Sequence, residues 1–377
     1  MKLLTVTVPC YNSQDYMEKC VRSILPGGER VEIIIIDDGS KDQTGAIADR
    51  LAEENPSIVR VVHQPNGGHG EGINQGLRHA TGKYFKTVDS DDWLSEDFPR
   101  FLDQLEECER QGGVDLFVTN YHYDHADGKG DRSINFSNAL PEGRIFTWEE
   151  TRPFRVDQIL MIHACTFRTE MLRQTGLEMP KHTFYEDNYM IYGNLQAVKR
   201  IFYLNTDLYR YFIGREGQSV QEDVMKRRYT HQLKATELCF TAFHLDDIPE
   251  KRKLRYLRHE MFIMFGIYIL YARLNQTEQA DRDLEQMWQH CRDYDEKWAE
   301  YFRRRTMLRF VCIPGASPGA PGRFFEIKKL DFYEIELFDF RMGPGGRALP
   351  AYPPIWLMAR RSVPASCRSK QWARGLP

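Results

Sequence analysis

The sequence lacks several features that would assign it quickly to a class of protein. Its 377 residues include eight cysteines, but these form no CxxC pair and have no regular spacing. Neither a zinc site nor a disulfide framework is therefore predicted, and a reducing compartment fits best. Excess charge is missing too, since the net charge is −3. That balance argues against a protein whose whole surface follows nucleic acid.

A long hydrophobic run is also absent. The most apolar stretch, MFIMFGIYILYA at residues 261–272, falls short of the roughly 20 residues that a membrane-spanning helix needs. Its pattern indicates a buried helix, with interfacial membrane contact as the alternative. The N-terminal MKLLTVTVPCYN reaches a proline too early for a signal-peptide core. We therefore expect a cytoplasmic protein.

What the first hundred residues do contain is a regular alternation of strand and helix patterns. Near-continuous apolar runs predict strands at LLTVTVPC, VEIIIIDD, IVRVVHQ and KYFKTVD, and a fifth follows at DLFVTNYHYDH. Helical spacing between them predicts helices, the first with Ser13 as a candidate N-cap. Continuous apolar strands separated by helices predict an α/β fold with a mostly parallel central sheet flanked by helices.

The remainder of the chain divides by composition. Residues 124–144 are polar and glycine-containing, which predicts a loop or an irregular excursion. Residues 221–310 have few helix breakers and predict a C-terminal helical extension. Residues 311–377 form a basic tail rich in proline and glycine, to which we assign no chemistry.

Unusual polar residues follow four of the predicted strands at their carboxyl ends. They occupy residues 9–12, 37–40, 63–72 and 89–93. In open α/β sheets, ligands bind outside the carboxyl ends of the strands. The four segments therefore predict one ligand site along a single edge of the sheet.

The sequence DSDD places Asp89, Asp91 and Asp92 directly after a strand. Like charges this close repel one another, so a cation is expected nearby. Carboxylate oxygens suit Mg²⁺ or Mn²⁺. The alternative is that Ser90 or Asp91 caps a helix that begins near Trp93. Capping accounts for one of the acids but not for all three.

Two other strand ends remain open to two interpretations each. The pair Asp37 and Asp38 either belongs to a helix cap with Ser40 or Asp42, or accepts a hydrogen bond from a nucleotide base or sugar hydroxyl. The loop NGGHGEG either aims backbone N–H groups at a phosphate or forms a plain turn.

A further acidic pair, Glu186 and Asp187, lies between aromatic residues in FYEDNYM. Desolvation there would raise a carboxyl pKa and suit it to proton abstraction. The alternative is a pair of acids at a helix N-terminus. Arg215 lies in a glycine-flanked loop and is either an exposed surface arginine or a phosphate clamp.

In combination these motifs are more specific than any one of them. The order PxYN, DDGS, NGG, DSDDW and then ED closely resembles family 2 glycosyltransferases with the GT-A fold, over roughly residues 1–220. The resemblance implies a nucleotide-binding half at 1–120 and an acceptor half at 121–220. It also implies transfer of a sugar, with inversion, from a nucleoside diphosphate sugar (often a UDP-sugar) to an acceptor hydroxyl.

The resemblance further implies a role for each matching residue. Pro9, Tyr11 and Asn12 line the nucleotide pocket, Asp38 holds the base, and Gly68 contacts the donor. Asp89 faces the sugar or ribose, and Asp91 with or without Asp92 holds Mn²⁺ or Mg²⁺. Asp187, with Glu186 beside it, deprotonates the acceptor, and Arg215 closes over the diphosphate. His69, which replaces a usual family residue, either contacts the donor phosphate or sugar or is a solvated loop histidine.

The chain departs from the family pattern at several positions. His69, Glu71 and Asn74 replace the usual residues after NGG, and IHACTF stands where many relatives carry a tryptophan. No QxxRW box of processive synthases is present, so a non-processive enzyme is expected. The nucleotidyltransferase alternative would require a basic, glycine-rich loop after the first strand, which PCYNSQD lacks. A non-catalytic sugar-nucleotide-binding protein is the other alternative, and the retained acids argue against it.

Expected partners follow from the same resemblance. They are a nucleoside diphosphate sugar and a carbohydrate or lipid-linked acceptor, in cell-envelope or extracellular polysaccharide or glycolipid synthesis, with no nucleic acid. Basic residues at 303–305 and 360–361 leave open peripheral contact with the inner face of a membrane, with a solvated charged face as the alternative. Dimerisation through 221–310 is also open.

Overall fold

The computed structural model describes residues 2–155, 158–214, 218, 221–306, 340–342 and 348–350. The strands are β1 (Leu4–Cys10), β2 (Val31–Asp37), β3 (Val59–His63), β4 (Tyr84–Thr87), β5 (Trp93–Leu94), β6 (Leu116–His125), β7 (Arg132–Ile134), β8 (Ile145–Phe146), β9 (Cys165–Arg168), β10 (Ile201–Ile213), β11 (Phe340–Met342) and β12 (Ala348–Pro350). The α-helices are α1 (Met17–Ile24), α2 (Thr44–Glu54), α3 (His69–His79), α4 (Phe98–Arg110), α5 (Thr169–Thr175), α6 (Glu186–Leu195), α7 (Glu222–Arg227), α8 (Tyr229–Thr241), α9 (Lys251–Leu274) and α10 (Glu278–Arg305).

A single mixed sheet forms the centre of the molecule. Its strand order is β3-β2-β1-β4-β9-β6-β10-β5, with β7 beside β6 and β8 beside β10. The pairs among β3, β2, β1 and β4 are parallel, as is the pair β6 with β10. The short strand β9 runs antiparallel between β4 and β6. The predicted α/β fold with helices around a central sheet is confirmed. The sheet is mixed because β9 and the short strands β5, β7 and β8 run antiparallel to their neighbours.

The carboxyl ends of the first three strands are in register. Cys10 lies opposite Asp37, and Asp37 lies opposite His63. Strand β4 pairs with β1 as far as Thr87 opposite Thr7, so Asp89 follows at the same edge. The predicted convergence of polar segments on one edge is therefore present.

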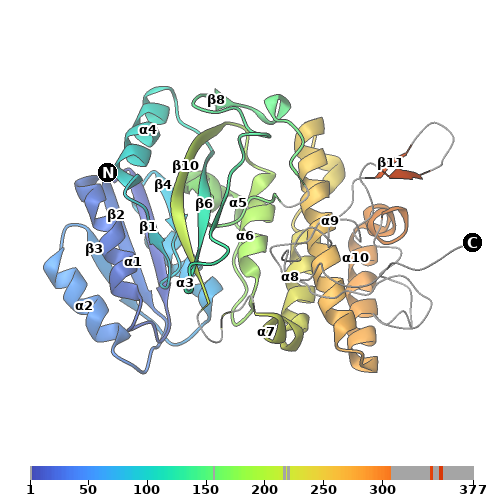
Figure 1. The fold of residues 1–377 in the computed structure, drawn as a ribbon, viewed down its shortest axis with the longest axis horizontal. Coiled ribbons are helices and arrows are strands. Elements are labelled where there is room, and N and C mark those ends of the chain that lie inside the picture. The colour runs from blue at the N-terminus through green and yellow to red at the C-terminus, as the bar shows by residue number, and fades with distance from the viewer. Residues whose placement is uncertain are drawn as a thin grey trace, which may run out of the picture.

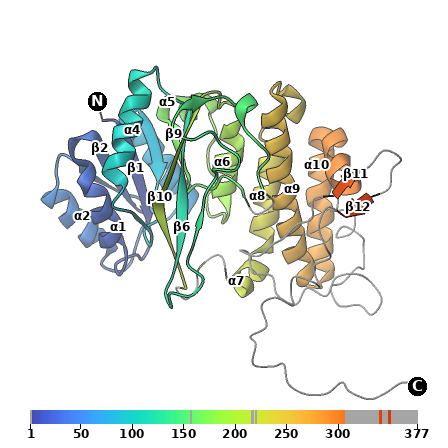
Figure 2. The same ribbon diagram turned by 45° about the horizontal axis from the view of Figure 1, so that its top comes forward.

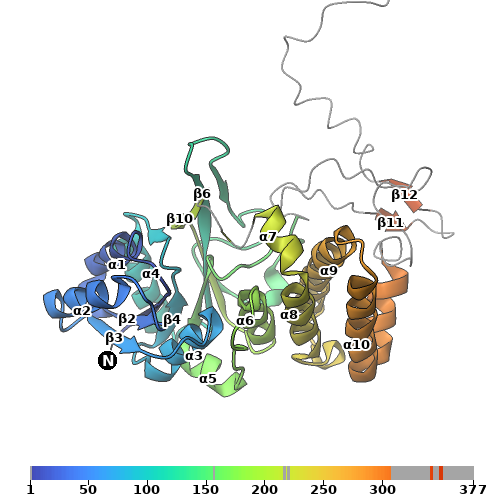
Figure 3. The same cartoon turned by 90° about the horizontal axis from the view of Figure 1, so that it is seen from below.

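The helices form layers on both faces of the sheet. Helices α1, α2 and α4 lie on one face, and α3, α5 and α6 lie on the other (Figures 1 and 3). Helix α6 packs on α8, and α8 in turn contacts α9 and α10. The turned view shows these four helices side by side, leading away from the sheet (Figure 2). The predicted C-terminal helical region is thus an added layer over α6.

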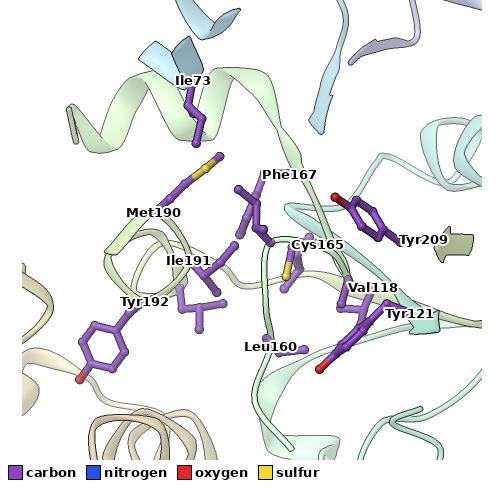
Figure 4. Packing of buried hydrophobic residues seen from close by; sticks show 14 of the residues in the cluster. Ile73, Val118, Tyr121, Leu160, Cys165, Phe167, Met190, Ile191, Tyr192 and Tyr209 are labelled. Atoms are coloured by element: carbon purple, nitrogen blue, oxygen red, sulfur yellow. The ribbon is translucent and has the colours of Figure 1, made fainter. Parts of the chain in front are cut away.

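The core that joins the sheet to this layer consists of large apolar side chains. Met190 lies close to Ile73 of α3, and Ile191 points toward Cys165 and Phe167 of β9 (Figure 4). Tyr192 points the other way and stacks on Phe243, with ring centroids 5.2 Å apart. Helix α6 is therefore held from both sides, which fixes the residues at its N-terminus.

Two predicted helix starts and one capping hypothesis are corrected by the structure. Helix α1 begins at Met17, and Ser13 does not cap it, because its hydroxyl pairs with that of Ser90 at 2.7 Å. No helix begins near Trp93, because the chain there enters β5, which pairs with β10. Helix α3 begins at His69 rather than after the glycine-rich loop, since HGEG is helical.

The remaining predictions for the fold have clear outcomes. Part of segment 124–144 forms β7, an ordered antiparallel partner of β6. The apolar stretch at 261–272 lies within α9 and is largely buried, as predicted. Among the described residues, no helix combines the length and apolar character needed to cross a bilayer. Most of the tail at 311–377 lies outside the described residues.

Replacement of Gly76 by alanine is expected to destabilise the fold by about 1–3 kcal/mol, because overpacked contacts of this kind cost that much. A Cβ atom at Gly76 would lie 2.1 Å from Oγ1 and 2.5 Å from Cβ of Thr7, so α3 would be pushed off β1. Denaturant unfolding of Gly76→Ala measures the change. The control is Glu53→Ala at an exposed position of α2, expected within about 0.5 kcal/mol of wild type. Equal stability of the two variants would contradict the close approach.

Candidate active site

The edge defined by the strand ends gathers most of the predicted site residues. Pro9 is the last residue but one of β1, and Tyr11 and Asn12 follow that strand. Asp38 follows β2, Gly68 is the N-cap of α3 and His69 is its first residue. The acidic run follows β4, and Glu186 is the first residue of α6. Arg215 lies outside the described residues, so its predicted role stays a prediction.

Asp38 fixes the backbone of the NGG loop. Its Oδ1 accepts hydrogen bonds from the backbone N–H of Gly67 at 2.7 Å and from the Gln64 amide at 2.6 Å, and its Oδ2 accepts from the N–H of Gly68 at 2.8 Å. The carboxylate is 3% exposed. Gly68 has φ +85°, a left-handed conformation that favours glycine. Asp38 therefore sets the start of α3, a role that neither interpretation of the DDGS motif included.

The loop after β1 is tied to the loop after β2. The Asn12 side chain accepts the backbone N–H of Lys41 at 2.9 Å, and the Asn12 N–H donates to the Ser40 hydroxyl at 3.0 Å. Asp42 accepts the N–H of Thr44, the first residue of α2, but it does so from the position before the N-cap, which is Gln43 and makes no side-chain capping bond. Between these anchors the Tyr11 side chain is 50% exposed. An exposed aromatic ring at a ligand edge offers a flat apolar face.

A histidine joins the two acidic motifs. The Nε2 atom of His69 lies 2.9 Å from Oδ1 of Asp89, and its Nδ1 atom lies 2.8 Å from Oε1 of Glu186. These carboxylates come from the strand-end cluster and from the start of α6, far apart in the sequence. Both ring nitrogens face acceptors, so the ring is bound most strongly when both carry protons. The site thus contains a carboxylate–imidazole–carboxylate bridge.

The electrostatics of the bridge agree with a charged ring. Desolvation disfavours the imidazolium and lowers the pKa of His69. The hydrogen bonds to Asp89 and Glu186, together with the negative charges of these two carboxylates, outweigh desolvation and raise the pKa of His69 well above its ordinary value of 6.5. For Asp89, burial acts against ionisation, yet His163 and His69 lower the pKa of the carboxyl below its usual range. An ionised Asp89 beside an imidazolium is therefore favoured at neutral pH.

The acids of DSDD occupy different environments. Asp92 is 1% exposed, and its carboxylate accepts hydrogen bonds from the Tyr209 hydroxyl at 2.6 Å and from the N–H of Phe212 at 2.8 Å. Burial and the charges of Asp91 and Asp89 raise the pKa of Asp92 well above its ordinary value. Asp91 lies on the turn after β4 and is partly exposed. The raised pKa favours the protonated form of Asp92, which removes one of the negative charges that repel one another in the motif.

A group of candidate metal ligands includes part of this motif. Asp89, Asp92 and His163 each place one ligand atom within 4.8 Å of the others. His163 precedes β9 and is buried against Tyr211, with ring centroids 4.5 Å apart, and its Nδ1 has no hydrogen-bond partner among the described residues. Sequence reasoning missed His163, because nothing in IHACTF indicates that its histidine faces an acid after β4.

Asp187 lies at the N-terminus of α6 next to the bridged Glu186. Burial and the neighbouring charge of Glu186 raise the pKa of Asp187 to about 6, while His163 and His69 oppose the shift. Glu186 is 2% exposed and bound to His69, whereas Asp187 is only partly buried. The two adjacent carboxyl groups therefore differ in what they can do, and Asp187 is the one available to exchange a proton near neutral pH.

Asn74, another departure from the family pattern, connects α3 to the segment before α6. Its side chain donates to the carbonyl of Met179 at 2.9 Å and accepts the N–H of the same residue at 2.8 Å. The segment is also bound to the NGG loop, because His182 donates its N–H to the carbonyl of Gly67 at 2.9 Å. Helix α3 thus holds both sides of the edge in place.

Comparison with known proteins gives a consistent family. Residues 5–173 match the family model described as Glycosyl transferase family 2. Glycosyltransferase GlyG of Streptococcus pneumoniae is 38% identical over 130 residues, which make up 34% of this chain and 42% of GlyG. The putative glycosyltransferase EpsH of Bacillus subtilis is 25% identical over 299 residues, covering 74% of this chain and 78% of EpsH. The chain spans less than half of GlyG.

Solved structures show the same fold. The crystal structure of S. aureus TarS 1–349 aligns with a TM-score of 0.62 and 18% identity, covering 94% of this chain and 97% of that one. A second structure of the same TarS fragment, in complex with UDP, aligns with a TM-score of 0.55 and 19% identity, covering 81% of this chain and 92% of that one. The likeness includes the GT-A-type arrangement of sheet and helices.

Replacement of His69 by alanine is expected to lower the free energy of unfolding by about 1–3 kcal/mol near neutral pH, because it leaves two carboxylates without their cation and the ring is partly exposed. Because the pKa of His69 is raised in the folded state, its contribution to the free energy of unfolding is complete below about pH 6.5 and is lost at alkaline pH. Because the pKa of Asp89 is lowered, the contribution of Asp89 is complete above about pH 4 and is lost in acid. Denaturant unfolding at about pH 6 and in alkaline buffer measures both effects.

The matched control for this experiment is His79→Ala in the same helix. In the described part of the chain, the His79 ring forms one hydrogen bond, to the carbonyl of Gln75 at 2.9 Å, so a loss below about 1 kcal/mol in the free energy of unfolding is expected. If His69→Ala were no more destabilising than His79→Ala near pH 6, the bridge would not be stabilising the site.

Proposed function

Because residues 5–173 match the family model described as Glycosyl transferase family 2, we propose that the chain transfers a sugar from a nucleoside diphosphate sugar to an acceptor hydroxyl, with inversion and with the help of a divalent cation. The donor is proposed to be a UDP-sugar, and the product to enter cell-envelope or extracellular polysaccharide or glycolipid. The match to this family model supports sugar transfer over the nucleotidyltransferase and non-catalytic alternatives that the sequence left open.

The observation that carries the proposal is the bridge from Asp89 through His69 to Glu186. It brings the strand-end acids of the donor side and the acidic pair of α6 to opposite sides of one imidazole ring, within two hydrogen bonds of 2.9 and 2.8 Å. A transfer site needs both groups at one sugar: one near the departing diphosphate and one near the incoming hydroxyl.

The donor side is proposed to follow the predicted roles. Tyr11 stacks on the nucleotide base, and Pro9, Asn12 and Gly68 line the remainder of the pocket. Asp38 is proposed to hold the base. Its carboxylate oxygens also bind the backbone N–H groups of Gly67 and Gly68, so it positions the NGG loop at the same time. UDP-sugars are the first donors to test because a TarS structure with this fold is described in complex with UDP.

The residues present fit a divalent cation of the hard class. The donor atoms nearest the edge are carboxylate oxygens, which suit Mg²⁺ or Mn²⁺. We assign the ion to Asp91, because both oxygens of Asp92 already accept hydrogen bonds from β10. When bound, such an ion supplies Lewis-acid stabilisation of the charge that develops on the diphosphate. Asp92 then serves to hold the turn that presents Asp91.

On the acceptor side, we assign the role of general base to Asp187. Its carboxylate takes the proton of the acceptor hydroxyl as the oxygen forms a bond to the anomeric carbon. The bond from that carbon to the diphosphate oxygen breaks in the same displacement, so configuration inverts and no covalent enzyme intermediate is needed. Glu186, held by His69, orients the start of α6 and contributes to the raised pKa of Asp187.

Asp187→Asn is expected to reduce the rate of sugar transfer by a factor on the order of 10²–10⁴, the usual contribution of a general base.

Asp91→Asn is expected to remove the dependence on Mn²⁺ or Mg²⁺ together with most of the activity. Release of free nucleoside diphosphate from a panel of UDP-, GDP- and dTDP-sugars, with each metal and with EDTA, measures both. Wild-type protein that consumes no donor with metal present, or retention of full activity by both variants, would refute the assignment. Glu53→Gln is the control.

Asp187→Asn is also expected to stabilise the fold, by about 1–2 kcal/mol at about pH 8. A folded-state pKa of about 6, raised from 3.8, means that ionised Asp187 destabilises the native state above that pKa. The destabilisation diminishes as the pH falls and vanishes below about pH 4, where the unfolded chain is protonated as well. Denaturant midpoints of variant and wild type across this range test the sign. A variant less stable than wild type at alkaline pH would contradict the raised pKa.

A further inference from the structure

A second exposed aromatic ring lies beside the acidic pair of α6. Among the described residues, Tyr11 and Phe184 are the large hydrophobic side chains that are exposed, at 50% and 39%. Tyr11 belongs to the donor side of the edge. Phe184 comes two residues before Glu186 and has no role in the transfer chemistry described above. A large apolar side chain left in solvent next to a reactive group calls for an explanation.

The backbone holds Phe184 outward at some energetic cost. Tyr185 has φ +67° and His182 has φ +49°, both in the left-handed region that non-glycine residues seldom adopt. Such conformations persist where the surroundings determine them, and they concentrate at ligand sites. Here the N–H of His182 is bound to Gly67, and the turn at Tyr185 directs Phe184 to solvent and Glu186 to the interior. The exposure of Phe184 is thus fixed by the same contacts that build the site.

The ring of Phe184 carries a cation. The guanidinium carbon of Arg228, at the start of α8, lies 3.5 Å from the ring centroid. His231 approaches edge-on at 5.5 Å, and its Nδ1 accepts the N–H of Phe184 at 3.4 Å. Because Nδ1 is an acceptor, a neutral His231 carries its proton on Nε2, which remains a donor. Both side chains come from the helical layer and face the segment that presents the acidic pair.

Positive charge on this face is not neutralised by the acids that the structure describes. Within those residues, Arg228 and Lys234 form no ion pair with a carboxylate, whereas Lys226 is paired with Glu222 at 2.6 Å. Burial lowers the pKa of Arg228 from its ordinary value, and an arginine stays charged at neutral pH. A guanidinium fixed over a ring and lacking a carboxylate partner is a ready site for an anionic oxygen group.

The cationic face is close to the reactive carboxylates. Burial, followed by the charges of Arg228 and Lys234, lowers the pKa of His231, and the carboxylate of Glu186 acts in the opposite direction. Arg228 and Asp187 likewise act with opposite sign on the pKa of Tyr185. Helix α7, which leads into Arg228, lies at the edge where β6 and β10 end (Figures 1 and 3). The face therefore adjoins the acidic pair at the start of α6.

We propose that Phe184, Arg228 and His231 form a subsite for an anionic group, a phosphate or a carboxylate, carried by the acceptor next to the hydroxyl that is glycosylated. The proposal rests on the proposed function, since an acceptor must lie against Asp187. Arg228 and the Nε2 of His231 bind the anionic oxygens, and Phe184 packs against the apolar face of the sugar or its linker. The chain would then select a charged acceptor over a neutral one.

Binding of small probes to the full chain, saturated with UDP and Mn²⁺, tests the subsite without transfer. The probes are glucose 6-phosphate, glucuronic acid and glucose, and ligand-observed NMR measures each Kd. At least one anionic probe is expected to bind ~10-fold or more tightly than glucose, the effect of a charge-assisted hydrogen bond. Comparison of the two anionic probes then shows whether the subsite prefers a phosphate or a carboxylate group. Equal binding of all three probes would overturn the proposal.

Variants locate the binding. Arg228→Gln is expected to remove the advantage of the anionic probe, and Arg228→Lys to retain part of it, while Arg227→Gln, at an exposed neighbour without a ring contact, leaves it within about twofold. Unfolding curves establish that each variant is folded. Phe184→Leu is a second variant that keeps an apolar side chain and is expected to weaken all three probes. An Arg228→Gln variant that binds glucose 6-phosphate and glucuronic acid as wild type does would overturn the assignment.

A competition measurement distinguishes the proposed anion subsite from the donor site. UDP is expected not to displace the anionic probe, and Arg228→Gln is expected to leave UDP affinity unchanged. Loss of UDP affinity in that variant would place Arg228 in the donor site and overturn the acceptor role. Turnover of UDP-sugars is measured in the same samples. Arg228-dependent binding in a chain that consumes no nucleoside diphosphate sugar would instead contradict the proposed function.

Discussion

His69 binds Asp89 through one ring nitrogen and Glu186 through the other, and the arrangement of the whole edge depends on where that ring lies. Its position comes from α3. Asp38 binds the backbone that starts the helix, and the close approach of Gly76 to Thr7 sets the helix against β1. Asn74 then fastens the segment that leads to α6. One helix, bound to β1, β2 and the acceptor side, therefore carries the contact between two otherwise distant acidic motifs.

The bridge also accounts for the difference between neighbouring carboxyl groups. Glu186 lies against the imidazole ring, while Asp187 beside it is left with a pKa raised to about 6. In the DSDD motif, Asp92 is directed into the protein by Tyr209, and Asp91 stays at the edge. When the surroundings of adjacent acids shift their pKa values apart, one acid can take a structural role while its neighbour accepts a proton.

Much of the fold could be predicted from the sequence, because its signals are local. Continuous Val and Ile runs predicted β1, β2 and β3, and the strand-end acids and the ED pair proved to share one edge. Other features depend on tertiary contacts. The glycines of HGEG suggested a loop, yet α3 begins there because Asp38 holds its first turn. A helix near Trp93 was wrong since β10 offers a pairing edge to β5. No local pattern indicates that His69 or His163 faces Asp89.

The charge of His69 in the metal-free chain is the most direct test of the bridge. Nitrogen-edited NMR of the histidine side chains, with His69 identified by the signal missing from His69→Gln, distinguishes an imidazolium from a neutral ring. The bridge predicts an imidazolium at about pH 7.5, above the ordinary histidine pKa of about 6.5. It also predicts a neutral ring at that pH once Asp89→Asn and Glu186→Gln are combined. A neutral His69 in the wild-type chain would contradict the central role given to this ring.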